Sequence, residues 1–295
     1  IQQRSDILEY LSPFGSPNEY VQNLSNQKVI NSEGSLTTCG SLYNKAYSIQ
    51  RCIDSVLNQS YINFQIVVVN DGSIDNSVQI LKSTYKEQIE SKKILLIEQK
   101  NQGVSVARNV GVSNSKSNYI CFLDADDEWK RDFLFKISRL ISDFPEASMY
   151  CLAHEVSKNN SIPTKKKQAF EENFRGYVED FFLSSSISDL ANSSKVCVKK
   201  EALLETGGFP IGITTGEDLY IWILIALKNR VAYEVSYEVI VHQQTDNSRI
   251  SRRNSVPYPF IYFSQNKNIE LTKSLKKYLF LIFYKHFLSS LLKFK

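Results

Sequence analysis

The chain has 295 residues, of which 42% are hydrophobic and 22% are charged, and its formal net charge is +4. This composition is typical of a globular protein and excludes an intrinsically disordered one. The charge is uneven. Residues 251–295 hold nine basic residues and one acidic residue (net +8), whereas residues 1–250 hold 26 basic and 30 acidic residues (net −4). Nucleic-acid-binding proteins usually spread basic residues over the binding domain, so we expect no nucleic-acid partner.

Strands and helices alternate from residue 34 onward, after a polar N-terminal extension at 1–33. Strands are predicted at 35–42, 65–69, 94–98 and 119–123, and helices at 48–58, 77–85 and 104–112. The first strand is a poor one, because threonine, cysteine and glycine at 37–40 occupy positions where a buried strand favours valine and isoleucine. The alternation predicts an α/β fold with a parallel, doubly wound sheet.

The pattern is looser after residue 130. A helix is predicted at 132–144, a strand at 148–153, a polar excursion at 162–168, a helix at 219–228 and a strand at 235–242. The five cysteines are widely separated and form no Cys-x-x-Cys pair, which favours buried thiols in a reducing cytosol over zinc or disulfides. The apolar run Tyr278–Tyr284 falls well short of the roughly 18 residues that span a bilayer, so we expect no transmembrane segment.

Acidic residues gather at the ends of the predicted elements. They are Asp71, the trio Asp124, Asp126 and Asp127, and the pair Glu217 and Asp218. Ligands of open α/β sheets bind at the carboxyl ends of the strands. Clustered carboxylates repel one another unless a cation neutralises them, and Mg²⁺ or Mn²⁺ binds carboxylates together with substrate phosphate oxygens. An Asp-x-Asp sequence alone is weak support, because acidic residues often end strands where the loops meet water.

The acidic residues belong to a longer series of motifs. In chain order these are Tyr43-Asn44, Val69-Asn70-Asp71-Gly72-Ser73, Asn101-Gln102-Gly103-Val104-Ser105-Val106-Ala107-Arg108-Asn109, Leu123-Asp124-Ala125-Asp126-Asp127, Gly207-Gly208-Phe209 and Gly216-Glu217-Asp218. In this order and spacing they resemble the family-2 glycosyltransferases of the GT-A fold, of the bacterial surface-polysaccharide type. The resemblance runs from about residue 34 to 251. It implies a Rossmann-like, mostly parallel sheet flanked by helices, with a nucleotide-binding half at 34–130, an acceptor half at 131–250 and a helical basic and aromatic tail at 251–295.

The resemblance also implies a set of donor-binding residues. Asp71 would accept a hydrogen bond from the uracil imide, and its alternative role is an Asx turn within Asp71-Gly72-Ser73. Ser41 and Tyr43 would contact the base, with a core position as the alternative for Tyr43. Arg108 would reach the nucleotide, or else form a surface salt bridge, and Asp124 would contact the ribose or base.

The same resemblance assigns the metal and the chemistry. Asp126 would bind Mn²⁺ or Mg²⁺ at the donor diphosphate, Asp127 would orient its neighbours, and His242 is a second metal candidate whose alternative role is structural. In inverting members of the family, the aspartate of the Glu-Asp pair deprotonates the acceptor hydroxyl, so Asp218 is the predicted catalytic base. Glu217 would orient the acceptor. The alternative for this pair is an ordinary charge at a helix N-terminus.

One departure from the family concerns the first strand. Relatives begin with an apolar strand that ends in proline, whereas this chain has Thr37-Thr38-Cys39-Gly40-Ser41-Leu42, so we expect a weaker strand and an altered base pocket. The Gln-x-x-Arg-Trp signature of processive synthases is absent, which indicates transfer of a single sugar. The predicted function is therefore metal-dependent, inverting transfer of one sugar from a nucleoside-diphosphate sugar, a UDP-sugar, to a glycan or lipid-linked saccharide in surface polysaccharide synthesis.

Two other functions stay open. A sugar nucleotidyltransferase would need a glycine-rich, basic phosphate loop after the first strand, which Gly40-Ser41-Leu42-Tyr43 does not provide. A non-catalytic sugar-nucleotide-binding protein of the same fold remains an alternative because the first strand is atypical. A nicotinamide dehydrogenase is excluded, since the chain contains no Gly-x-Gly-x-x-Gly sequence.

The tail interleaves lysine with tyrosine, phenylalanine, leucine and isoleucine over 275–295. Lysine stems and aromatic rings suit the headgroup boundary of an anionic membrane, so we expect a cytoplasmic enzyme attached peripherally to the inner face of the cell membrane. The alternative is a terminal helix packed on the body or on a second subunit of a homodimer. In the membrane interpretation the basic tail stands apart from the active site.

Overall fold

The computed structural model describes residues 35–243, 256–266 and 269–291, so the extension at 1–33 and parts of the tail lie outside the described residues. The strands are β1 (Leu36–Leu42), β2 (Phe64–Asp71), β3 (Ile94–Gln99), β4 (Tyr119–Phe122), β5 (Glu128–Trp129), β6 (Ala147–Lys158), β7 (Thr164–Lys165), β8 (Arg175–Tyr177), β9 (Val196–Lys199) and β10 (Arg230–Gln243). The helices are α3 (Ile49–Leu57), α4 (Ser77–Thr84), α5 (Lys86–Glu90), α6 (Val104–Asn114), α7 (Phe133–Asp143), α8 (Phe181–Ile187), α9 (Lys200–Glu205), α10 (Glu217–Lys228), α12 (Tyr258–Gln265) and α13 (Lys273–Leu291).

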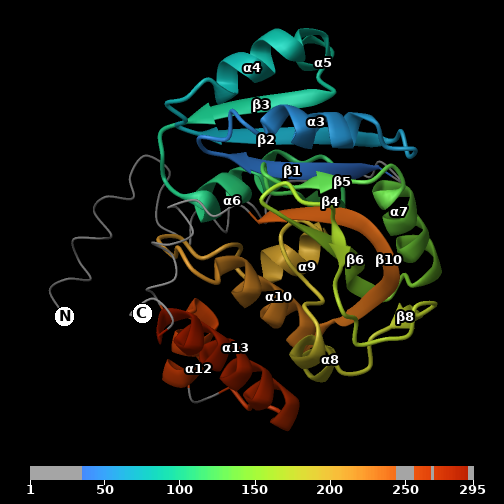
Figure 1. Ribbon diagram of the computed structural model, residues 1–295, viewed down its shortest axis with the longest axis vertical. Coiled ribbons are helices and arrows are strands. Elements are labelled where there is room, and N and C mark those ends of the chain that lie inside the picture. Colours follow the sequence, from blue (N-terminus) through green and yellow to red (C-terminus); the bar gives the residue numbers. More distant parts are fainter. Residues whose placement is uncertain (1–34, 244–255, 267–268, 292–295) are drawn as a thin grey trace, which may run out of the picture.

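The strands form one curled sheet in the order β3-β2-β1-β4-β9-β6-β10-β5, with β7 paired to β6 and β8 to β10 (Figure 1). The run β3-β2-β1-β4 is parallel throughout. Strand β9 lies antiparallel between β4 and β6, and β10 pairs with β6 in parallel. The predicted α/β fold is confirmed, and the sheet is mixed because β5, β7, β8 and β9 pair antiparallel with their neighbours.

Strand β1 lies at the centre of the parallel half and pairs with a strand on either side. It is in register with β2 from Leu36 to Leu42, and with β4 over its first four residues. Its small side chains have a packing role, since a Cβ added at Gly111 of α6 would lie 2.1 Å from Cys39 Sγ. The strand therefore pairs on both sides despite its poor strand-forming sequence, and the small residues allow α6 to lie close against the sheet.

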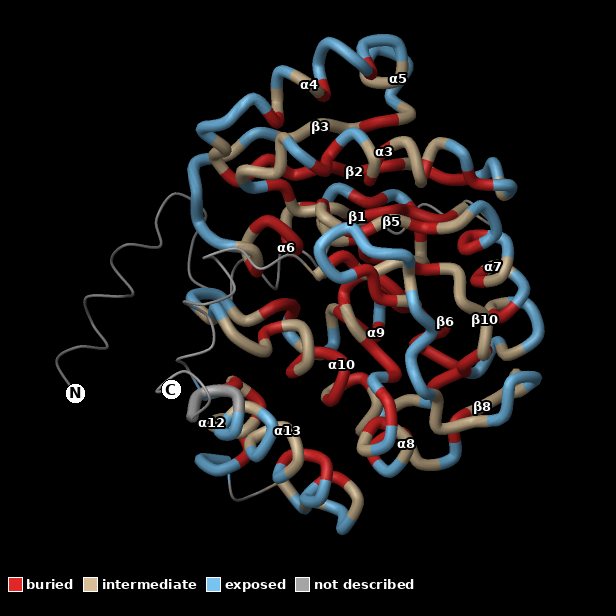
Figure 2. The backbone as a smooth tube through the Cα atoms, in the orientation of Figure 1, coloured by how far each residue is buried: buried red, intermediate tan, exposed pale blue. Residues whose placement is uncertain are grey.

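Helices cover both faces of the sheet, and the buried residues concentrate between the layers (Figure 2). Alternate residues of β2 point to opposite faces, as the strand geometry requires. Ile66 and Val68 enter a core with α3, α4 and α7, whereas Val67 and Val69 pack on Ala107 of α6. The sites at the carboxyl ends of the parallel strands thus rest on a rigid, two-sided layer.

The tail helices α12 and α13 lie together beside α8 and α10 (Figure 1). Buried residues of both helices, Phe263, Leu275, Tyr278 and Leu279, join the core that contains Trp222 of α10. One face of the tail therefore packs on the body, as the alternative interpretation expected. No helix among the described residues combines the length and the apolar content needed to cross a membrane.

The cysteines are all free and buried: Cys39, Cys52, Cys121, Cys151 and Cys197. Several short elements escaped the sequence prediction, namely α5, α8, α9, β5, β8 and β9. Strand β7 lies within the expected polar excursion, and α12 lies within the expected helical tail. Helix α10 begins at Glu217, two residues before the predicted start, which places Glu217 and Asp218 in its first turn.

Candidate active site

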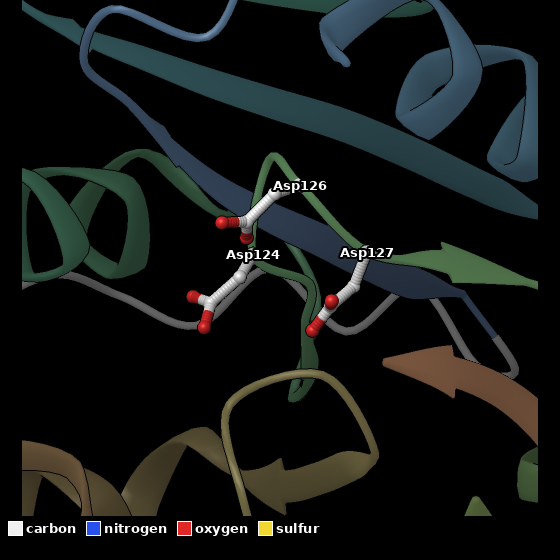
Figure 3. A group of neighbouring side chains, drawn as sticks. All are labelled: Asp124, Asp126 and Asp127. Atoms are coloured by element: carbon white, nitrogen blue, oxygen red, sulfur yellow. The ribbon is translucent and has the colours of Figure 1, made fainter. Parts of the chain in front are cut away.

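An acidic turn follows β4 at the centre of the sheet. The amide of Asp127 donates to the carbonyl of Asp124 at 3.0 Å and closes the turn. One carboxylate oxygen from each of Asp124, Asp126 and Asp127 lies within 4.8 Å of the others, and Figure 3 shows all three side chains leaving this turn. Three carboxylates this close match the hard oxygen donors that Mg²⁺ and Mn²⁺ prefer.

The three carboxylates have different surroundings. Asp127 is buried, and its Oδ1 accepts from the amide of His242 at 2.8 Å while its Oδ2 accepts from Ser194 Oγ. Burial raises the pKa of Asp127 well above its ordinary value, and the charges of Asp126 and Asp124 raise it further. The side chains of Asp124 and Asp126 are 40% and 20% exposed. Asp127 thus holds the turn to β10, and the other two carboxylates can reach a ligand.

Lys45 occupies one oxygen of Asp126. Its Nζ donates to Asp126 Oδ2 at 2.8 Å and to the hydroxyl of Tyr47 at 3.1 Å. Burial lowers the pKa of Lys45, but the charge and hydrogen bond of Asp126 outweigh burial and leave this pKa above its usual value. Sequence reasoning missed Lys45, although its place two residues after Tyr43 at the carboxyl end of β1 was a usable signal.

Arg108 joins the acidic turn to helix α10. Its two terminal nitrogens donate to Asp124 Oδ1 and Glu217 Oε1, each at 2.9 Å, and its side chain is only 6% exposed. Burial alone would lower the pKa of Arg108, but the charges of Asp124 and Glu217 hold this pKa above its usual value. The salt bridge is therefore buried and double, and the guanidinium is already occupied by two carboxylates.

Asp218 lies in the first turn of α10. The N-cap residue of this helix is Gly216, which adopts a left-handed backbone conformation with a φ of 76°. Asp218 Oδ2 accepts from Ser193 Oγ at 3.1 Å, and Oδ1 accepts from the amide of Leu219 at 2.7 Å. Burial raises the pKa of Asp218, the charge of Glu217 adds to this rise, and the nearby arginine opposes it. A half-buried carboxylate with raised proton affinity is suited to accept a proton from a substrate hydroxyl.

The nucleotide-binding candidates lie at the ends of β1 and β2. Both oxygens of Asp71 are engaged by the loop before α6, with Gln102 and Gly103 donating their amides at 2.8 Å. The Asx turn expected of Asp71 is instead closed by Asn70, whose Oδ1 accepts from the amide of Ser73 at 3.0 Å. Asp71 therefore fixes that loop, whether or not a base also binds it.

Two further base-contact candidates and one metal candidate have distinct positions. Ser41 is half-buried at the end of β1, and Tyr43 is 47% exposed, so Tyr43 is not a core aromatic. His242 Nε2 lies 2.8 Å from Glu128 Oε1, and its ring is not part of the carboxylate trio. Its assignment as a metal ligand stays a prediction.

The tail packs against the turn that carries Asp218. The amide of Tyr258 donates to the carbonyl of Thr215 at 3.0 Å, and a Cβ at Gly216 would lie 3.1 Å from the ring of Pro259. The rings of Tyr258 and Tyr262 meet Tyr220 of α10 edge-on at 5.0 and 4.8 Å. The expectation that the tail stands apart from the active site is therefore wrong, because tertiary packing brings α12 against α10.

Comparison with known proteins places this geometry among sugar-transferring enzymes. Residues 41–200 match the model of the family described as glycosyl transferase family 2. The chain is 39% identical over 109 residues to the glycosyltransferase GlyA of Streptococcus pneumoniae, which is 37% of this chain and 15% of that protein. It is 30% identical over 189 residues to an uncharacterised glycosyltransferase of Rickettsia bellii, which is 64% of this chain and 26% of that protein. It is 31% identical over 121 residues to the chondroitin synthase of Pasteurella multocida, which is 41% of this chain and 12% of that protein.

The chain thus spans about a quarter or less of the length of these relatives. Among solved structures, residues 1–349 of Staphylococcus aureus TarS in complex with UDP-GlcNAc superpose with a TM-score of 0.68 and 18% identity, over 83% of this chain and 71% of that one. The mannosyltransferase PcManGT of Pyrobaculum calidifontis, in complex with GDP-Man and Mn²⁺, superposes with a TM-score of 0.60 and 17% identity, over 91% of this chain and 76% of that one. Both likenesses show the same fold.

Proposed function

Since the chain belongs to the family-2 glycosyltransferases, we propose that it moves one sugar from a UDP-sugar to a hydroxyl of a glycan or lipid-linked saccharide, with inversion at the anomeric carbon. The observation that carries the proposal is the Arg108 bridge. It joins the acidic turn to the first turn of α10, which holds Asp218 with its raised proton affinity. In this proposal the bridge would hold a metal and donor site and a base at one place.

In the proposed reaction Asp218 takes the proton of the acceptor hydroxyl. The acceptor oxygen then forms a bond to the anomeric carbon, on the face opposite the departing group. The bond from that carbon to the diphosphate oxygen breaks, and the nucleoside diphosphate leaves with the electron pair. Glu217, held by Arg108, would orient the acceptor.

The donor would be bound by the other half of the site. Ser41, Tyr43 and Asp71 would contact the base, and Asp126 with Asp124 would hold Mn²⁺ or Mg²⁺. When bound, such an ion supplies positive charge to the diphosphate. Support comes from the nucleotide sugars in the TarS and PcManGT structures and the Mn²⁺ in the latter. A role in surface polysaccharide synthesis is supported by the similarity to a chondroitin synthase.

The test combines donor binding with turnover. A thermal-shift panel of UDP- and GDP-sugars, with and without Mn²⁺, should show metal-dependent stabilisation by one donor. Asp218→Asn should retain this stabilisation and lose turnover. Full turnover by Asp218→Asn would refute the base assignment, and donor binding without turnover by the unaltered protein would favour the non-catalytic alternative.

We also propose that α13 attaches the enzyme to the inner leaflet. Its buried face packs on the body, and its free face exposes Phe280 (61%) and Tyr284 (47%) beside Lys276 and Lys277. Residues 273–291 include no acidic side chain. An exposed aromatic face with uncompensated positive charge suits an anionic headgroup layer.

Sedimentation with phosphatidylglycerol vesicles tests this attachment. The double variant Phe280→Ser/Tyr284→Ser should lose vesicle binding, whereas the matched control Ile62→Ser/Ile74→Ser, at residues 83% and 90% exposed elsewhere, should keep it. Equal binding by all three proteins would refute the proposal. Concentration-dependent dimerisation abolished by the first variant would instead assign this face to a homodimer.

A further inference from the structure

Two adjacent serines connect the two halves of the site. They lie in the segment between α8 and β9, and Ser193 and Ser194 are 2% and 1% exposed. Ser193 Oγ donates to Asp218 Oδ2 at 3.1 Å. Ser194 Oγ donates to Asp127 Oδ2 and accepts from the amide of Asp124 at 3.2 Å. The two serines lie in a turn that the amide of Lys195 closes by donating to the carbonyl of Asn192 at 3.2 Å, and through their different partners one short segment reaches both the acidic turn and α10.

The segment that carries these serines is fixed from several sides. Trp129 Nε1 donates to the carbonyl of Ser194 at 2.7 Å. The next residue, Lys195, is fully buried, and its Nζ donates to the carbonyl of Asp189 and lies 3.1 Å from His154 Nδ1. Burial and the neighbouring lysine lower the pKa of His154 to about 3, so the imidazole stays neutral beside the ammonium. The serine hydroxyls therefore have little freedom to move.

We propose that Ser193 is a positioning residue for Asp218, holding the carboxylate in one orientation and in its charged form, and that Ser194 fixes the acidic turn to the same segment. The proposal rests on the function of Asp218 as base. Besides the amide of Leu219, three titratable groups face this carboxylate: Glu217 of its own helix, Arg108 from α6 and Tyr278 from α13.

A hydrogen bond donated to a carboxylate stabilises its charged form and so opposes the effect of burial. Loss of the Ser193 hydroxyl should raise the pKa of Asp218 by about 0.5 to 1 unit, the equivalent of one hydrogen bond. The acid limb of the kcat/KM profile should move to higher pH by the same amount. Because Oδ2 then loses its fixed partner, kcat should fall while KM for the donor stays unchanged.

The experiment compares Ser193→Ala and Ser193→Thr with the control Ser186→Ala. Ser186 is a half-buried serine of α8 whose hydroxyl donates to the carbonyl of Phe182 at 2.8 Å and meets no carboxylate. Two quantities are followed: the acid limb of kcat/KM, and the titration of the Asp218 carboxyl by ¹³C NMR in the enzyme without donor, assigned with Asp218→Asn.

Ser193→Ala should shift both quantities, and Ser193→Thr should restore them, with Ser186→Ala matching the unaltered enzyme. If Ser193→Ala does not fold, Ser193→Cys takes its place, since the thiol is a weaker donor and the shift should have the same direction. Coincident titrations of the variant and the unaltered enzyme would overturn the proposal. Activity retained by Asp218→Asn would instead overturn the base assignment, so the two failures are distinguishable.

Discussion

Replacing Arg108 with methionine should destabilise the protein by about 3 to 5 kcal/mol, the usual cost of breaking a buried ion pair. Methionine keeps much of the packing volume but removes the charge that lies between two carboxylates. The main loss is at Glu217, whose side chain is 12% exposed and would be left buried without a counter-charge.

The second partner contributes less. Asp124 is 40% exposed, so water can replace much of the lost interaction and its share is at most about 1 kcal/mol. The guanidinium also lies 5.3 Å from the ring centroid of Phe209, a contact worth about 0.5 to 1 kcal/mol. At about 2 °C per kcal/mol for a chain of this size, Tm should fall by about 8 °C.

Denaturant unfolding of a double-mutant cycle measures the effect. Adding Glu217→Gln to Arg108→Met should recover more than about 1 kcal/mol, because it removes the unpaired buried charge. Adding Asp124→Asn should recover much less. The reasoning is refuted if Arg108→Met lies within 1 kcal/mol of the unaltered protein, or if the two second variants recover equal amounts.

Three further predictions concern other parts of the site and its support. Lys45→Ala should tighten Mn²⁺ binding about fivefold without donor, since it removes a competitor worth about 1 kcal/mol from Asp126; unchanged affinity by calorimetry would contradict this. Gly111→Ala should cost at least about 1 to 3 kcal/mol, because its Cβ would overlap Cys39 Sγ. Cys39→Ala in the same chain should recover most of that loss in urea unfolding, and no recovery would count against the packing argument. Asp71→Ala should leave two amides before α6 without acceptors and speed their hydrogen exchange, with the rest of the sheet unaffected.

The parallel half of the fold was predictable because its signals are local. The run Ile66–Val69 is apolar without interruption, which a buried parallel strand requires, and the motifs at its end are contiguous in sequence. The acidic turn and the pair at the start of α10 were found for the same reason. Strand β1 shows the limit of propensity, since its threonines pair fully once neighbouring strands flank them.

The connections between these motifs were not predictable from local pattern. Arg108 was expected to face the nucleotide, but its partner Glu217 lies 109 residues further along the chain. Ser193 and Ser194 belong to no periodic pattern, and their hydrogen bonds to Asp218 and Asp127 form only when β9 brings the segment beside β4. The position of helix α12 against α10, through Tyr258, was not predicted because it depends on tertiary packing rather than on the sequence period of the helix.

The complete burial of the native thiols has a practical consequence for following the enzyme in solution. With all five cysteines enclosed, a single cysteine introduced on the surface would be the thiol that a maleimide dye reaches in the folded protein. A polarity-sensitive dye at Tyr284→Cys would change its emission when vesicles are added if α13 enters the headgroup layer, and the same dye at Ile74→Cys would serve as the reference. The chain is thus ready for site-specific fluorescence without first removing its own cysteines.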